Sequence, residues 1–87
     1  LTHIEEFINQ HHVLTLATNT QDGELSVCNL FYVYDSTRQS FVFASDEKTT
    51  HMQNIQSFSN RVAGGIVLET KEVGKIQGLQ FRADVIS

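Results

Sequence analysis

The sequence predicts a mainly β fold, an antiparallel barrel with two short helices, built by one domain over residues 1–87. Two observations carry this prediction. Segments rich in β-branched and aromatic residues recur along the chain and are separated by short turns, which favours antiparallel pairing of consecutive strands. Apolar residues follow helical spacing in two places, near the start and in the middle of the chain. A chain of this length builds a single domain with a modest core.

The first two elements are a helix over residues 4–11 and a strand over residues 13–18. The apolar face of the helix repeats at i, i+3, i+4 and i+7 and consists of Ile4, Phe7, Ile8 and His11. The strand is rich in β-branched residues. A turn follows it and ends at Gly23, because glycine accepts a positive φ without steric cost.

A long strand is predicted over residues 24–34, followed by a turn and a strand over residues 41–44. Apolar residues occupy both faces of the long strand. This pattern is typical of a central strand that is covered on both sides.

The second half of the chain predicts a helix over residues 46–57 and two strands, residues 61–69 and 75–86. Met52 and Ile55 are the expected buried residues of this helix. The last strand alternates apolar and polar residues with a period of two, as a strand with one covered face does.

The composition limits the function classes. Six Lys and Arg residues against ten Asp and Glu residues give a net charge of -4, which disfavours nucleic acid as a partner because phosphate binding needs the opposite bias. The one cysteine, Cys28, excludes an internal disulfide and a Cys-rich zinc framework and fits a reducing compartment, so we expect a cytoplasmic protein. No apolar run approaches the roughly 20 residues that span a bilayer, and the four histidines lack the spacing of a metal site. We therefore expect no membrane partner and no metal.

The residues with the clearest chemical potential lie where the strand over 41–44 gives way to a helix. Exposed N–H groups at a helix start attract an anion, and side chains that could add donors around a phosphate follow at Lys48, Thr49, Thr50 and His51. The plain alternative is that Ser45 or Asp46 caps the helix while Lys48 is solvated. Spacing alone favours this alternative, because such caps are common.

A resemblance to a known family adds to the phosphate hypothesis, and it rests on the order and spacing of three segments. They are Asn29-Leu30-Phe31-Tyr32 in a strand that ends at Asp35, then Glu47-Lys48-Thr49-Thr50-His51, and Ile76-Gln77-Gly78-Leu79-Gln80-Phe81-Arg82. In this combination the chain resembles the FMN-binding split β-barrels related to pyridoxamine 5'-phosphate oxidase, and most closely their YhbP-like branch. The resemblance implies a homodimer that holds FMN at the subunit interface. It also implies further elements beyond residue 87.

The resemblance places cofactor contacts in four segments of the chain. The long strand would contact the flavin through Cys28, Asn29, Leu30 and Phe31. The end of the next strand would lie beside the ring and the ribityl chain at Ala44 and Ser45. The phosphate would be held by Thr49, by Lys48 and by His51, which stands where a lysine is usual. The second subunit would contribute Gln77, Gln80 and Arg82.

These residues leave three functions open. The first is an FMN-dependent oxidoreductase of a small molecule, for which no catalytic acid or base is assigned. The second is a binding module that holds haem or another ligand on the same barrel, and the third is a homodimer without a small ligand. Plain structural roles are the alternative for single residues: Cys28 as a small buried hydrophobe, Asn29 as a partner of the neighbouring backbone, and Arg82 as a solvent-facing residue.

Overall fold

The computed structural model describes residues 3–75 and 77–86. The elements in chain order are α1 (His3–Gln10), β1 (Val13–Asn19), β2 (Leu25–Phe31), β3 (Val33–Asp35), β4 (Ser40–Val42), α2 (Thr50–Ser57), β5 (Arg61–Leu68), the 3-10 turn η1 (Val73–Lys75) and β6 (Gln77–Asp84). The predicted mainly β fold with two short helices is confirmed. Ile76, which belongs to the predicted last strand and to one of the resembling segments, lies outside the described residues.

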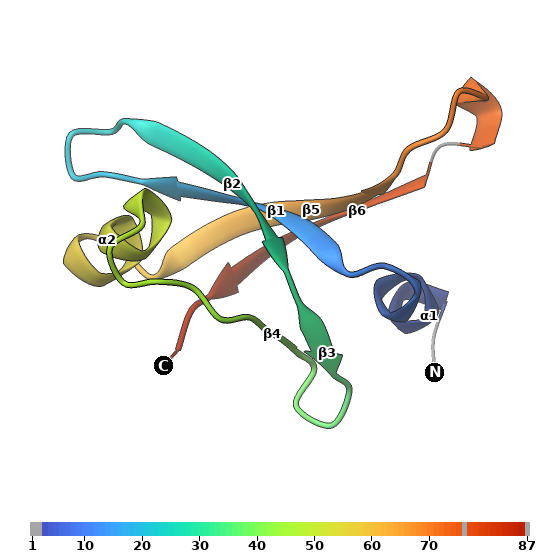
Figure 1. Cartoon of the computed structure of the whole chain (residues 1–87), viewed down its shortest axis with the longest axis horizontal. Helices are drawn as coiled ribbons and strands as arrows, with labels where there is room; N and C mark the ends of the chain where they lie inside the picture. The colour runs from blue at the N-terminus through green and yellow to red at the C-terminus, as the bar shows by residue number, and fades with distance from the viewer. Residues whose placement is uncertain (1–2, 76, 87) are drawn as a thin grey trace.

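The strands form two antiparallel sheets (Figure 1). The larger sheet has the strand order β2-β1-β5-β6, and β3 pairs with β4 in the smaller one. In the larger sheet, β1 and β2 form a hairpin that turns at Gly23. The φ of Gly23 is 84°, in the region that favours glycine, and its N–H donates to the Thr20 carbonyl at 3.0 Å. Pairing of Thr15 with Gly65 joins the first half of the chain to the second.

The long strand predicted over residues 24–34 is divided at Tyr32. The Tyr32 N–H donates to the His12 carbonyl at 2.9 Å, and its hydroxyl donates to the Ile8 carbonyl at 2.6 Å. These two hydrogen bonds fix Tyr32, which lies between β2 of the larger sheet and β3 of the smaller sheet. The prediction of a central strand is wrong for this chain, because β2 is an edge strand of its sheet and its outward apolar side chains are exposed.

The core lies on the inner face of the larger sheet. Its buried apolar residues are Ile8, Leu14, Leu16, Leu30, Tyr32, Ile55, Val62 and Ile66. The Phe81 ring covers Gly64: a Cβ atom added to this glycine would lie 2.5 Å from Phe81 Cζ and 2.6 Å from the Thr15 carbonyl oxygen. Gly64 therefore allows an aromatic ring and a neighbouring strand to approach β5 closely.

The second helix begins later than predicted. Residues 46–49 form a turn in which the Lys48 N–H donates to Asp46 Oδ1 at 2.8 Å, and α2 starts at Thr50. Buried Asn54 donates to the buried Thr18 hydroxyl of β1 at 3.0 Å, which fixes the helix on the sheet. Of the two residues expected to be buried, Ile55 is buried and Met52 is half-buried.

Candidate functional site

Three polar side chains converge between β4 and α2. The Ser45 hydroxyl lies 2.6 Å from His51 Nε2, and the Thr49 hydroxyl lies 3.2 Å from the same nitrogen. The Thr49 hydroxyl donates its proton to the Asp46 carbonyl at 2.7 Å, so Nε2 can bond to Thr49 only as a donor. An unprotonated Nε2 instead accepts the Ser45 hydroxyl. We call Ser45, Thr49 and His51 the polar cluster.

The start of α2 lies within this cluster and lacks a side-chain cap. The N-cap residue is Thr49, whose backbone is extended with φ -69° and ψ 153° and whose side chain makes no capping hydrogen bond. Neither Ser45 nor Asp46 caps the helix: Ser45 contacts His51, and Asp46 Oδ1 accepts the N–H of Lys48. N–H groups of a first helical turn have no acceptor within their own helix and, with the helix dipole, favour an anion.

A largely apolar hollow of about 850 Å3 opens beside the cluster. Ser45 lines it together with Ala44, and the apolar side chains around it include Phe43, Met52, Ile55, Phe81 and Val85. Its volume falls within the roughly 300–1,000 Å3 of small-molecule sites. A ligand with an apolar ring and an anionic end therefore finds both environments side by side.

The four long-strand candidates divide between the two faces of β2. Cys28 and Leu30 point into the core, whereas Asn29 and Phe31 point outward. The Thr15 hydroxyl donates to Asn29 Oδ1 at 2.7 Å, so Asn29 is bonded to a side chain rather than to the backbone. Burial raises the pKa of the Cys28 thiol, which lowers its thiolate fraction and fits a small packing residue. Because β2 is an edge strand, alternate backbone groups of this segment point away from β1 and are open to a ligand or a partner.

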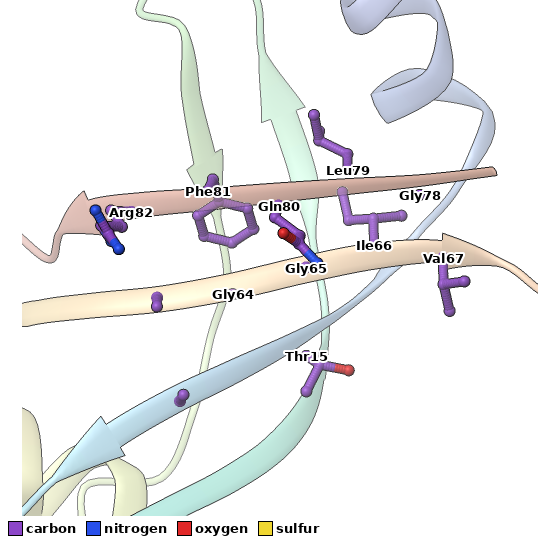
Figure 2. A pocket seen from close by; sticks show the side chains of 12 residues that line it. Thr15, Gly64, Gly65, Ile66, Val67, Gly78, Leu79, Gln80, Phe81 and Arg82 are labelled. Atoms are coloured by element: carbon purple, nitrogen blue, oxygen red, sulfur yellow. The ribbon is translucent and has the colours of Figure 1, made fainter.

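The three β6 candidates also divide. Gln80 and Arg82 alternate with the inward Leu79 and Phe81 and point outward, while Gln77 lies on the opposite side by strand alternation. Register across the sheet places Asn29 beside Thr15, Thr15 beside Gly65, and Gly65 beside Gln80. Figure 2 shows Thr15 and Gln80 on either side of Gly65.

The structure thus brings Ser45, Thr49 and His51 together, with Ala44 beside them, and places Asn29, Phe31, Gln80 and Arg82 on one outward face. Neither the polar cluster nor the outward face includes Cys28, Leu30 or Gln77. Lys48 is exposed in the turn before α2. Sequence reasoning missed a shallow trough on the outward face, lined by residues that include Ala17, Ala63, Gly65 and Gly78. The signal was present as small residues at alternate positions of β5.

The described part of the chain holds no group of three or more His, Cys, Asp or Glu side chains placed to bind one metal ion. None of its helices has the length and apolar character needed to cross a membrane.

The architecture is that of a split-barrel protein. It resembles the solved structure of HutZ, a haem storage protein from Vibrio cholerae, with a TM-score of 0.77, 20% identity and coverage of 93% of this chain and 57% of that chain. It also resembles the conserved hypothetical protein Rv2991 from Mycobacterium tuberculosis, with a TM-score of 0.78, 19% identity and coverage of 97% and 51%.

In sequence the chain is similar to proteins named UPF0306 protein YhbP. It is 35% identical over 85 residues to the protein of that name from Escherichia fergusonii and 34% identical to the one from Escherichia coli O7:K1. Each alignment covers 98% of this chain and 56% of the relative, so the chain spans about half the length of the curated relatives it matches. No protein-family model matches the chain.

Proposed function

We propose that the chain is an FMN-binding split-barrel protein of the YhbP-like branch, which holds the FMN phosphate at the start of α2 and works as a homodimer. The observation that carries this proposal is the convergence of Ser45, Thr49 and His51 at a helix start without a side-chain cap. The sequence similarity to YhbP proteins and the shared fold support it.

The residues present fit a phosphate group. The Ser45 and Thr49 hydroxyls each lie within hydrogen-bond distance of His51 Nε2. One anion that displaces these contacts can therefore be reached by all three side chains, with the Thr49 hydroxyl donating to it in place of the Asp46 carbonyl. The Asp46 carboxylate is directed to the Lys48 N–H rather than to the helix start. His51 can donate from Nε2 to a phosphate oxygen in place of the usual lysine, and exposed Lys48 can add its charge from the adjacent turn.

The hollow beside the cluster suits the rest of the cofactor. Ala44 and Ser45 line it, which supports the proposal that they lie beside the flavin ring and ribityl chain. FMN would supply the electron or hydride transfer of an oxidoreductase acting on a small molecule, while the chain binds and orients it.

The test compares FMN with riboflavin, which has the same ring and lacks the phosphate. We expect quenching of flavin fluorescence to give at least about tenfold tighter binding of FMN, since a charge-assisted hydrogen bond contributes about 1.5–3 kcal/mol. The variant Lys48→Ala with His51→Ala is expected to bind both ligands with similar affinity. The matched control is Lys71→Ala with His3→Ala, which removes the same two residue types from exposed positions elsewhere.

Either of two results contradicts the proposal. One is equal affinity of the unaltered chain for FMN and riboflavin. The other is an unchanged preference for FMN in the double variant. A weaker preference in the control as well would mean that total charge, rather than the polar cluster, attracts the phosphate.

Haem is the second candidate, because the solved structure of HutZ, described as a haem storage protein, shares this fold at a TM-score of 0.77. Titration with haemin distinguishes the candidates, since bound haem gives an intense Soret band. A saturable Soret change without FMN binding would replace the flavin by haem. An FMN titration that saturates at one cofactor per chain would exclude this replacement.

A further inference from the structure

The contact between Ser45 and His51 has the geometry of a nucleophile beside its base. The Ser45 hydroxyl oxygen lies 2.6 Å from His51 Nε2, at the short end of the roughly 2.6–3.2 Å over which a base activates a hydroxyl. Both side chains are half-buried. They are therefore held by their surroundings and still accessible to a small molecule.

The second hydroxyl of the polar cluster does not compete for the lone pair of His51 Nε2. The Thr49 hydroxyl donates its proton to the Asp46 carbonyl at 2.7 Å, so it has no proton to offer to the imidazole. In the neutral imidazole with its proton on Nδ1, the Nε2 lone pair is left to the Ser45 hydroxyl. The polar cluster thus directs the proton of one hydroxyl, that of Ser45, to a base.

Hydrogen-bond donors for an oxyanion lie at the start of α2. Attack of a hydroxyl oxygen on an ester carbonyl develops negative charge on the carbonyl oxygen, and fixed N–H groups near this oxygen stabilise the charge. His51 is the second residue of α2, whose first turn has no side-chain cap. Because Ser45 contacts His51, its hydroxyl lies close to the N–H groups of this turn, which have no acceptor within their own helix.

The hollow beside the polar cluster suits the acyl chain of an ester. Ser45 lines this hollow of about 850 Å3, and its apolar side chains include Phe43, Met52 and Ile55. An apolar acyl chain that enters the hollow leaves water, which favours its binding. The carbonyl carbon at the end of this chain can then lie next to the Ser45 hydroxyl.

We propose that Ser45 and His51 are a nucleophile and base that hydrolyse esters of small apolar carboxylic acids. His51 Nε2 takes the Ser45 proton as Oγ bonds to the ester carbonyl carbon. The tetrahedral oxyanion then collapses, the C–O bond to the alcohol breaks, and His51 gives the proton to the leaving alkoxide oxygen. Water attacks the acyl group on Ser45 with His51 again as base, which releases the carboxylic acid and restores the serine hydroxyl.

This activity goes beyond the proposed function and uses the same side chains. A phosphate that displaces the Ser45 contact occupies the position of the developing oxyanion, so FMN and the ester compete for the polar cluster. Thr49 stabilises neither leaving group nor base in this scheme, because its hydroxyl proton is engaged by the Asp46 carbonyl.

The test is mass spectrometry of the chain after treatment with a fluorophosphonate, in which an activated serine oxygen bonds to phosphorus and fluoride leaves. We expect one label per chain, which peptide mapping places on Ser45, and no label in Ser45→Ala. We expect His51→Gln to lower the rates of labelling and of p-nitrophenyl butyrate hydrolysis by about 100-fold or more, as loss of a general base does. The control is Ser57→Ala, which removes an exposed serine at the end of α2 and should leave both rates unchanged.

The outcomes distinguish ester hydrolysis from flavin binding. A label on Ser45 in a chain that binds FMN and riboflavin equally supports the hydrolysis and contradicts only the cofactor. An unlabelled Ser45 overturns the hydrolysis, whether or not FMN is preferred. A folded His51→Gln variant, as judged by circular dichroism, that is labelled as fast as the unaltered chain also overturns it. Peptide mapping of the unaltered chain decides the matter even where a variant does not fold.

Discussion

The effect of Gly64→Ala on stability follows directly from the structure, because the atoms that an added methyl group would contact are known. In Gly64→Ala the new Cβ would lie 2.5 Å from Phe81 Cζ and 2.6 Å from the Thr15 carbonyl oxygen. Ordinary contacts begin at about 3.4 Å, so both neighbours would have to retreat by nearly 1 Å. The Phe81 ring is itself stacked on Phe41 at a centroid distance of 4.7 Å, and the Thr15 oxygen belongs to the strand that pairs with β5.

We expect Gly64→Ala to lower the free energy of unfolding by about 2–3 kcal/mol, the upper part of the usual cost of overpacking. For a domain of this size, this loss corresponds to a decrease of roughly 10–20 °C in Tm. Thermal unfolding followed by circular dichroism measures it. Gly74→Ala is the control, because nothing lies within 4 Å of its added Cβ, and its Tm should change little.

A second variant separates the steric clash with the Phe81 ring from the clash with the Thr15 carbonyl oxygen. Adding Phe81→Leu to Gly64→Ala removes the ring but leaves the Thr15 carbonyl oxygen in place. The double variant should recover part of the loss and remain less stable than Phe81→Leu alone. A Gly64→Ala protein as stable as the Gly74→Ala control would refute the close approach of β1, β5 and the Phe81 ring.

Two further predictions concern the position of α2 and the state of the cysteine. Asn54→Ala should lower the free energy of unfolding by about 1–3 kcal/mol, because it leaves the buried Thr18 hydroxyl without its partner. Urea unfolding measures this loss, with Asn60→Ala at an exposed position as the control. Equal unfolding midpoints for the two variants would contradict the prediction. Burial raises the pKa of the Cys28 thiol above its ordinary value, so the folded state holds this proton more tightly than the unfolded state. The resulting stabilisation is complete below the ordinary pKa and is lost as the pH rises from that value through the raised pKa of the folded state. Alkylation of Cys28 in the folded chain should accordingly need a higher pH than alkylation in denaturant, and coincident pH profiles would contradict the burial.

The sequence predicted the order and type of the main elements because most of them carry a clear period. The alternation of β6 and the helical spacing of α1 are both visible in the residues alone. The division of the long strand at Tyr32 was not predictable in this way. Tyr32 keeps the inward phase of its strand, and the bend depends on hydrogen bonds to His12 and Ile8, which are distant in sequence.

The geometry of the candidate site could not be predicted from the sequence either. The sequence predicts phosphate donors at Lys48, Thr49, Thr50 and His51, but the contact of Ser45 with His51 depends on how the turn over residues 46–49 folds. Sequence spacing could not decide whether Ser45 caps the helix or contacts the histidine. The apolar outward side of β2 was visible as a pattern, whereas its exposure depends on β2 being an edge strand of the sheet.

The most direct test of the central claim is the NMR signal of His51 Nε2 in 15N-histidine-labelled protein during titration with FMN and, separately, with riboflavin. If the polar cluster holds the phosphate, FMN should displace the Ser45 contact and shift this signal, while riboflavin should leave it nearly unchanged. An FMN complex in which the His51 signal stays at its free position would contradict the claim.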